Sequence, residues 1–291
     1  MKTIAKGYNL AITVNDISLS YDDVGEGRVP VIFLHGFPFD KSMWELQLEL
    51  LKFTYRLISC DIRGFGKSTD EYSPLSIDLF TDDLIQFMDK LKIEKAIVCG
   101  LSMGGYIALN AVKRFPRRFE GLVLSDTQCI ADTAEGKEKR YKVIEDIEAN
   151  GVTKFNEGFI KNVFHPDSPI NKKEIVAQLS SVVFSNSQYI IIQGLTALAE
   201  RTETCTALKE IAIPTLIMCG REDVVTPLAQ SEAMNAAIKG SKLHIIENAG
   251  HVSNLDQPHE FAKYLSEFLG SIDGVGMDKL AEEKFNHTYG K

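Results

Sequence analysis

The chain has 291 residues, of which 44% are hydrophobic and 25% are charged. This composition is close to that of an average globular protein and excludes the collagen-like, coiled-coil and low-complexity classes. The 32 lysines and arginines against 40 aspartates and glutamates give a formal net charge of −8 at pH 7, which argues against nucleic acid as a partner, because a nucleic-acid-binding surface neutralises phosphates with basic residues.

The sequence contains five cysteines, an odd number, which are widely spaced and include no C-x-x-C pair. We therefore expect neither a disulfide framework nor a metal site, but reduced thiols in a cytoplasmic protein. The first ten residues contain no apolar run of signal-peptide length, and no stretch of the sequence approaches the length of a membrane span. The sequence thus predicts a soluble, unexported protein with no membrane partner.

Short apolar runs rich in β-branched residues, each bounded by turn residues, predict eight strands. These are residues 10–14, 17–21, 31–34, 56–60, 96–99, 121–125, 215–219 and 242–246. The first two are joined by only Asn15 and Asp16, which indicates an antiparallel hairpin. The later strands alternate with helical patterns, which predicts a mainly parallel sheet. The helical patterns are residues 44–52, 79–91, 105–115, 227–237 and 258–269.

One interval, residues 127–213, breaks this alternation. It contains helical patterns but no convincing strand, so we expect a helical lid inserted into a core formed by residues 1–126 and 214–270. The lid helices are expected at residues 135–149, 154–163, 172–184 and 189–200. Residues 271–291 form a polar, glycine-containing tail with one short helical pattern at 278–285, and the sequence leaves open whether this tail is docked.

The segment after the strand 96–99 has the pattern G-x-S-x-G and leads into a helix. It reads Gly100-Leu101-Ser102-Met103-Gly104. A sharp turn that lifts Ser102 above the sheet edge brings positions 100 and 104 close together, so a Cβ atom at either position would collide. The same turn aims the Met103 N–H toward an oxyanion that forms at a substrate carbonyl. The pattern predicts a nucleophilic serine.

A serine hydroxyl is a weak nucleophile without a base, so a carboxylate and a histidine should follow in the order Ser, Asp, His. Asp223 follows the strand 215–219, and His251 follows the last strand. The carboxyl ends of parallel strands meet at one edge of a sheet, so we expect both residues near Ser102. Asp126, directly after the strand 121–125, is a rival candidate for the acid, with a pocket wall or a helix cap as its other roles.

The loop after the third predicted strand should supply a second oxyanion donor. We assign the N–H of Phe37, because Pro38 has none and Gly36 lets the backbone approach the substrate oxygen. We expect His35 to hold this loop by hydrogen bonds rather than to act as a base.

Aromatic residues near these loops predict an apolar acyl pocket, although aromatics in such places are also typical of plain core. Phe39 and Trp44 are our candidates for substrate binding. We expect the lid helices to set substrate shape through aromatics on their inner face, which are Phe155, Phe159, Phe164, Phe184 and Tyr189.

Four motifs together resemble those of the α/β-hydrolase superfamily. They are His35-Gly36-Phe37-Pro38, Asp61 to Ser68, Gly100 to Gly105, and Gly250-His251. The resemblance extends over nearly the whole chain, and within the superfamily the pattern is similar to carboxylesterases and 3-oxoadipate enol-lactonases, with cofactor-free perhydrolases also close. It implies an eight-stranded, mainly parallel sheet flanked by helices, with an inserted lid. It also implies a catalytic triad of Ser102, Asp223 and His251.

These features predict a serine hydrolase that cleaves carboxylic esters of small molecules through an acyl-enzyme, with no metal or organic cofactor. Enol-lactone hydrolysis is the close alternative, favoured if Lys139, Arg140 or Lys142 reaches the pocket. From a different class, a small-molecule receptor with slow turnover stays open on the same scaffold. We expect a monomer or homodimer whose ligand is a small ester or lactone.

Overall fold

The computed structural model describes residues 5–70 and 72–274, and one eight-stranded sheet runs through it in the order β1-β2-β4-β3-β5-β6-β7-β8. The strands are β1 (Gly7–Val14), β2 (Ile17–Val24), β3 (Val31–Leu34), β4 (Leu57–Cys60), β5 (Ala96–Leu101), β6 (Phe119–Ser125), β7 (Thr215–Gly220) and β8 (Lys242–Ile246). β2 pairs antiparallel with β1 and β4, and the other neighbouring strands are parallel. The predicted hairpin and mainly parallel sheet are confirmed.

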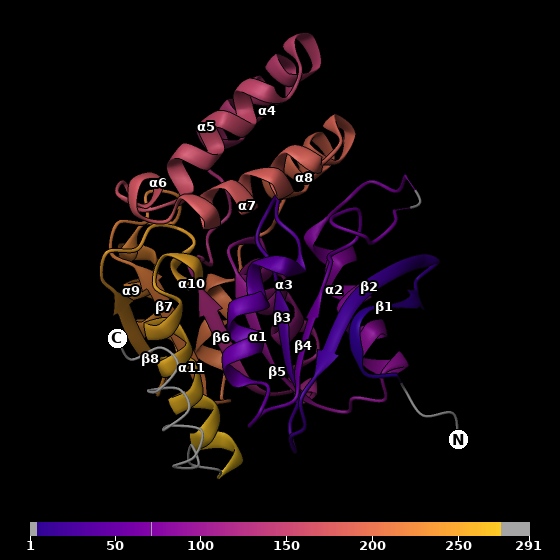
Figure 1. Cartoon of the computed structure of the whole chain (residues 1–291), viewed down its shortest axis with the longest axis vertical. Coiled ribbons are helices and arrows are strands. Elements are labelled where there is room, and N and C mark those ends of the chain that lie inside the picture. The colour runs from indigo at the N-terminus through magenta and orange to yellow at the C-terminus, as the bar shows by residue number, and fades with distance from the viewer. Residues whose placement is uncertain (1–4, 71, 275–291) are drawn as a thin grey trace.

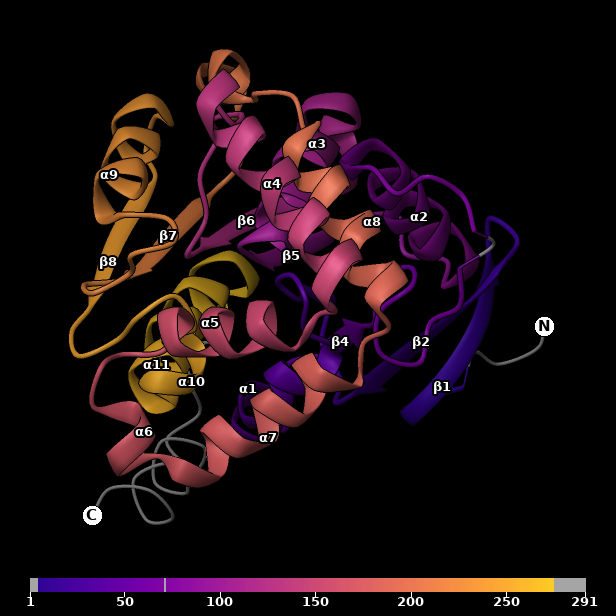
Figure 2. The ribbon, with the colours of Figure 1, turned by 90° about the horizontal axis from the view of Figure 1, so that it is seen from above.

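Helices cover both faces of this sheet (Figures 1 and 2). One face carries α2 (Ile77–Lys90), α3 (Met103–Arg114) and α9 (Leu228–Ala237), and the other carries α1 (Glu45–Leu51) and α11 (Pro258–Asp273). Successive residues of β3 enter different cores, since Ile32 packs in the first and Phe33 in the second. A central strand buried on both faces needs apolar side chains throughout, which is why its sequence is a continuous apolar run.

Short helical turns connect several of these elements. They are η1 (Lys41–Trp44), η2 (Pro116–Arg118), η3 (Cys205–Glu210) and α10 (Ser253–Asp256). Sequence periodicity did not predict α10, because a four-residue helix is too short to show a period. Its position matters for the site, since it begins two residues after His251.

The segment between β6 and β7 is helical and lies over one end of the sheet (Figure 1). It contains α4 (Ala134–Asn150), α5 (Thr153–Val163), α6 (Ser168–Asn171), α7 (Lys173–Ser185) and α8 (Gln188–Ala199). Thr133 and Ser187 begin α4 and α8 by accepting backbone N–H groups at their N-termini. Gly151, whose φ of 83° suits glycine, follows the last residue of α4. We refer to α4–α8 as the insertion.

Within the described residues, no single helix has the length and apolar composition to cross a membrane. α7 and α8 reach that length and composition only when taken together, and they are bent by 95° relative to each other. The helical pattern expected at 278–285 lies outside the described residues.

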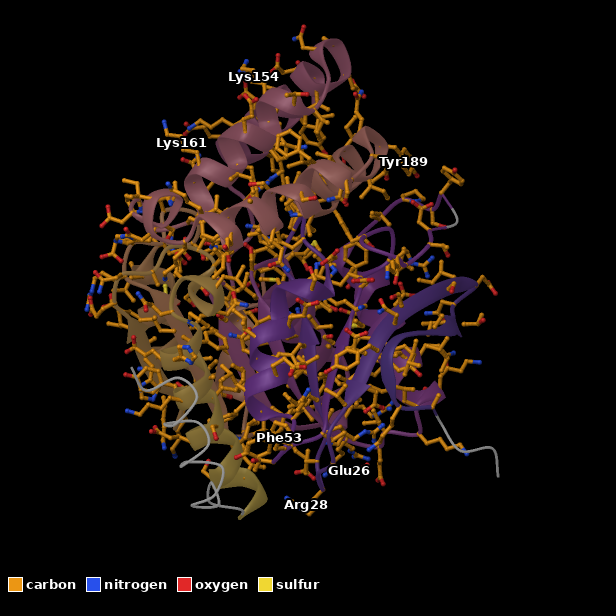
Figure 3. The ribbon with its side chains drawn as sticks, in the orientation of Figure 1. Glu26, Arg28, Phe53, Lys154, Lys161 and Tyr189 are labelled. Carbon is orange, nitrogen blue, oxygen red and sulfur yellow. A yellow bond between two sulfur atoms is a disulfide. The ribbon has the colours of Figure 1, made fainter. Side chains whose placement is uncertain are left out.

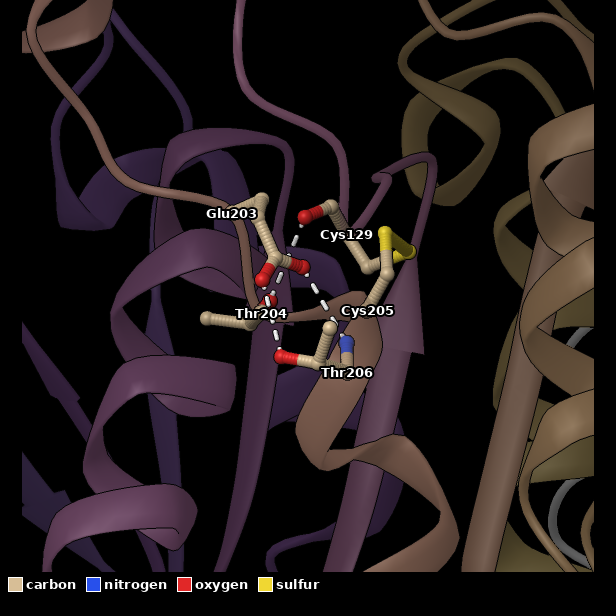
Figure 4. The surroundings of a disulfide bond; sticks show 5 residues. All are labelled: Cys129, Glu203, Thr204, Cys205 and Thr206. Carbon is tan, nitrogen blue, oxygen red and sulfur yellow. Dashed lines mark hydrogen bonds between the residues drawn. A yellow bond between two sulfur atoms is a disulfide. The ribbon is translucent and has the colours of Figure 1, made fainter.

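Cys129 and Cys205 form a disulfide (Figure 4), so the expectation that all five thiols are reduced is wrong. The two cysteines are 76 positions apart, and the fold brings them together because the insertion leaves and rejoins the sheet at the neighbouring strands β6 and β7. The Thr204 N–H also donates to the Cys129 carbonyl, at 2.9 Å. The disulfide thus closes the base of the insertion, and the argument from reduced thiols to a cytoplasmic location loses its basis.

Candidate active site

Ser102 lies in the turn between β5 and α3 with φ 54° and ψ −112°, a strained conformation for a residue with a side chain. A Cβ atom at Gly100 would come within 2.2 Å of the Gly104 carbonyl oxygen, and one at Gly104 within 2.2 Å of the Leu34 carbonyl oxygen. Both glycines are therefore required by the turn. The turn holds Ser102 at the edge of the sheet, where its side chain meets loops from other strands.

The three residues of the predicted triad come together in one hydrogen-bonded chain. Ser102 Oγ lies 2.9 Å from His251 Nε2, and His251 Nδ1 lies 2.9 Å from Asp223 Oδ2. All three side chains are buried, with Ser102 8% exposed and His251 1% exposed. An imidazole held in this way can accept the serine proton at Nε2 while the carboxylate fixes its other nitrogen.

Thr226 is a further part of this arrangement that the sequence analysis missed. Its N–H donates to Asp223 Oδ1 at 2.9 Å, and its hydroxyl lies 2.7 Å from Asp223 Oδ2. The Val225 N–H also donates to Asp223 Oδ1, at 2.8 Å. An Asp followed three residues later by Thr is a spacing typical of such a side-chain-to-backbone turn, so the signal was present in the sequence.

The surroundings of His251 and Asp223 favour the charged forms of both side chains. Burial lowers the pKa of His251, but the charge and hydrogen bond of Asp223, with the charge of Asp126, outweigh it and raise that pKa above its ordinary value. Burial raises the pKa of Asp223, but His251 and the donors of Thr226 outweigh it and hold the pKa below its ordinary value. Asp223 is therefore a carboxylate at neutral pH and stabilises a positively charged imidazolium.

Asp126, the rival acid, occupies a different position. Its carboxylate accepts hydrogen bonds from the Ser125 hydroxyl, the Gly220 N–H and the Ser253 hydroxyl. It therefore neither takes the place of Asp223 against His251 nor caps a helix nor lines the cavity described below.

One group of possible metal ligands was found in the described part of the chain. An oxygen of Asp126, an oxygen of Asp223 and the Cys219 sulfur lie within 4.8 Å of one another. Burial raises the pKa of the Cys219 thiol well above its ordinary value, and both carboxylates already accept hydrogen bonds from protein donors. We assign no metal site to these three residues.

The two predicted oxyanion donors lie at the start of α3 and in the loop after β3. α3 begins at Met103, so its N–H has no acceptor within the helix and lies at the positive end of the helix dipole. In the Phe37 loop, His35 Nδ1 lies 2.9 Å from the Gly36 carbonyl oxygen, and His35 Nε2 accepts from the Ile62 N–H at 2.9 Å. Burial lowers the pKa of His35, so the neutral ring donates on one side and accepts on the other, as expected.

A cavity of about 470 Å³ opens beside Ser102 and His251, between the sheet edge and the insertion. Its apolar walls include Phe37, Phe155, Phe159, Leu195 and Leu198. Its more polar side includes Tyr106, Arg140, Asp146, Lys154 and Asn162. Lys154 and Lys161 belong to the insertion, and Lys154 lies near its outer end (Figure 3). Glu26, Arg28 and Phe53 lie at the opposite end of the molecule.

Phe39 and Trp44, the candidates for substrate binding, do not line this cavity. Both side chains are fully buried. Trp44 packs between Phe33 and Phe261, with ring centroids 5.0 and 6.0 Å away. Phe39 packs against the ring of Phe159 at 5.6 Å. Trp44, the last residue of η1, therefore supports the core, and Phe39, before this turn, supports the cavity wall through Phe159.

The aromatics of the insertion divide between the cavity and other surroundings. Phe155 and Phe159 line the cavity. Phe184 is 46% exposed, and Tyr189 packs against Tyr72 with ring centroids 5.5 Å apart. Phe164 is buried but is not among the cavity walls. Of the five aromatic residues expected on the inner face of the insertion, Phe155 and Phe159 line the cavity, and both lie on α5.

Of the three basic residues considered for a substrate carboxylate, Arg140 lines the cavity. Lys139 and Lys142 instead pair with glutamates one turn earlier on the solvent side of α4. Arg140 Nε donates to Asp132 at 2.8 Å, and Arg201 pairs with the same carboxylate at 2.8 Å. Two guanidinium groups thus share one carboxylate at this side of the cavity.

The chain is similar to known proteins in both sequence and structure. Residues 29–258 match the family model described as the alpha/beta hydrolase fold. The 3-oxoadipate enol-lactonase 2 of Acinetobacter baylyi is 30% identical over 251 residues, which are 86% of this chain and 92% of that protein. A thermophilic esterase from Thermogutta terrifontis has a TM-score of 0.86 at 30% identity, with 91% of this chain and 98% of that chain covered. For the enol-lactonase from Burkholderia xenovorans LB400 the TM-score is 0.83 at 25% identity, over 89% of this chain and 99% of that chain.

Proposed function

The chain belongs to the α/β hydrolase family, and we propose that it is a serine hydrolase that cleaves carboxylic esters of small molecules through an acyl-enzyme. The observation that carries the proposal is the hydrogen-bonded chain from Ser102 through His251 to Asp223, with both distances 2.9 Å. The 470 Å³ cavity that reaches Ser102 and His251 supports it, because it gives an ester access to the hydroxyl.

In this mechanism Ser102 Oγ attacks the ester carbonyl carbon while His251 Nε2 takes the hydroxyl proton. The N–H groups of Phe37 and Met103 bind the oxyanion of the tetrahedral intermediate. His251 then gives its proton to the leaving alkoxide, and Asp223 stabilises the imidazolium throughout. Water attacks the acyl-enzyme with the same histidine as base and releases the acid.

The walls of the cavity support an apolar group as the part of the ester that it receives. Five of its lining side chains are phenylalanine or leucine, and two of these, Phe155 and Phe159, come from one face of α5. Each methylene buried against such walls contributes about 0.8 kcal/mol. Gly158 on the same helix adds room, because an added Cβ atom there would meet nothing within 4 Å.

Hydrolysis of a lactone that carries a carboxylate is the second candidate. Arg140 and Arg201 share the single carboxylate of Asp132, so this side of the cavity carries an excess of positive charge that would attract an anionic substrate. Lys154 at the rim is offset by Asp146, 3.2 Å away, which leaves Arg140 as the group on which this candidate depends. The similarity to enol-lactonases supports the same reading.

One screen separates these candidates from a receptor that turns over slowly. The purified protein is assayed with p-nitrophenyl esters of graded acyl length, with small neutral lactones and with carboxylated enol-lactones, and Ser102→Ala is the control. An esterase turns over the esters most rapidly and loses that activity in Ser102→Ala. A carboxylate-selective lactonase prefers the enol-lactones, and Arg140→Gln then raises KM for them alone. Binding without turnover of any of these compounds would indicate a receptor and contradict the proposal.

A further inference from the structure

Asp126 connects the two loops that carry the acid and the base. Its Oδ1 accepts the Gly220 N–H at 2.8 Å, three residues before Asp223, and its Oδ2 accepts the Ser253 hydroxyl, two residues after His251. Its own backbone is held on β7, since the Asp126 N–H donates to the Met218 carbonyl at 2.9 Å. One fully buried carboxyl group thus bonds to the end of β7, where the Asp223 loop begins, and to the start of α10, where the His251 loop ends.

The same carboxyl group lies close to the charges of the triad. Asp223 on the loop after β7, Cys219 on β7, Cys99 on β5 and His251 on the loop after β8 are the titratable groups that face it. Burial raises the pKa of both thiols, so they stay neutral. The charges that interact with Asp126 are therefore those of Asp223 and His251.

We propose that Asp126 is a positioning residue for the catalytic histidine: it fixes the two loops relative to each other, and its negative charge adds to that of Asp223 in stabilising the His251 imidazolium. This inference rests on the proposed function of Ser102, His251 and Asp223. Asp126, the rival candidate for the acid, thus has a different role: it acts through its neighbours and does not contact the imidazole.

The direction of the coupling follows from the charges. Burial and the charge of Asp223 raise the pKa of Asp126 to about 7, so its charge develops at neutral pH. A negative charge favours the protonated imidazole, and the charge of Asp126 raises the pKa of His251. Without the Asp126 charge, His251 should lose its proton at lower pH.

The test compares Asp126→Asn with Asp256→Asn. Asn fits position 126, where φ is 45°, because asparagine tolerates left-handed backbone. Asp256 is the matched control: it is a fully buried carboxylate that accepts the Gly250 N–H at 2.8 Å, and so holds the loop of His251 from another side. It is not among the groups that shift the pKa of His251. The readouts are the NMR titration of the His251 ring, and kcat and KM against pH with the preferred ester.

The proposal expects the His251 titration to move to lower pH in Asp126→Asn and to stay in place in Asp256→Asn. It also expects kcat of Asp126→Asn to fall by about tenfold with KM little changed, because a small displacement of the base affects the chemical step. An unchanged His251 titration in Asp126→Asn, or equal movement in both variants, would overturn it. If Asp126→Asn fails to fold by circular dichroism, Ser253→Ala decides in the same way, with a smaller shift to lower pH expected. The NMR titration does not depend on turnover. If the protein has no hydrolytic activity, the proposed function is contradicted, but the titration still decides whether Asp126 influences His251.

Discussion

His251 Nδ1 lies 2.9 Å from Asp223 Oδ2, whereas the hydrogen bonds of Asp126 go to Ser125, Gly220 and Ser253. The two carboxylates that follow neighbouring strands therefore have different partners. An imidazole has one nitrogen left for an orienting group once the other faces the serine, and Asp223 occupies it. We therefore expect a substitution of Asp223 to reduce catalysis more than a substitution of Asp126.

Asp223→Asn should lower kcat by about four orders of magnitude, because an amide neither fixes the required tautomer nor stabilises the imidazolium, as in the serine-protease example. Asp126→Asn should lower it by about tenfold. Steady-state kinetics of both variants with one short-chain ester provide the measurement. A larger loss in Asp126→Asn than in Asp223→Asn would move the orienting acid to position 126.

The pH dependence of kcat/KM should reflect the raised pKa of His251. The imidazole must be neutral to take the Ser102 proton, so activity is present above the pKa of His251 and is lost as the pH falls through it. The midpoint of this loss should lie above 6.5, the ordinary histidine value. Initial rates with a p-nitrophenyl ester from about pH 5 to about pH 9 measure it. A midpoint below 6.5 would show that burial outweighs the charges of the carboxylates.

Phe159→Ser should change acyl-length preference without removing the chemistry, because Phe159 lines the cavity. Loss of this apolar wall should reduce kcat/KM for a long acyl ester by about tenfold or more relative to an acetate ester. Phe184→Ser is the matched control, since Phe184 is an aromatic residue of the same insertion but is 46% exposed. The same length profile in Phe159→Ser and in wild type, with both folded by circular dichroism, would place specificity elsewhere.

The disulfide should contribute to stability through the loop that it closes. Because Cys129 and Cys205 are 76 positions apart, the double variant Cys129→Ser/Cys205→Ser should lose about 2–4 kcal/mol of unfolding free energy in urea. Thr204 still bonds to the Cys129 backbone carbonyl in that variant, so hydrolysis of a short ester should persist. Equal stability of the two proteins under oxidising conditions would show that the disulfide does not constrain the unfolded chain.

The parts of the site that sequence could predict are those with local causes. The strained turn at Ser102 excludes a Cβ at positions 100 and 104, so its glycines are visible in the sequence. The apolar runs of the central strands reflect burial on both faces, so the sheet was visible too. His251 is predictable because it follows a strand whose carboxyl end meets the same sheet edge.

The parts that sequence could not predict depend on how distant segments pack. An aromatic side chain near the site can face the cavity or the core, and Trp44 faces the core against Phe33 and Phe261. The direction of Arg140 depends on how α4 docks over the sheet, and its neighbours Lys139 and Lys142 point to solvent. The disulfide joins residues 76 positions apart, and no local spacing marks such a pair.

Covalent labelling of Ser102 tests the central claim most directly. The protein is treated with a fluorophosphonate, digested and analysed by mass spectrometry, with Ser102→Ala as the control. The proposed mechanism predicts an adduct on Ser102, loss of ester hydrolysis in proportion to labelling, and neither label nor hydrolysis in a folded Ser102→Ala protein. An adduct on another residue, or ester hydrolysis by Ser102→Ala at the wild-type rate, would contradict the claim that Ser102 is the nucleophile.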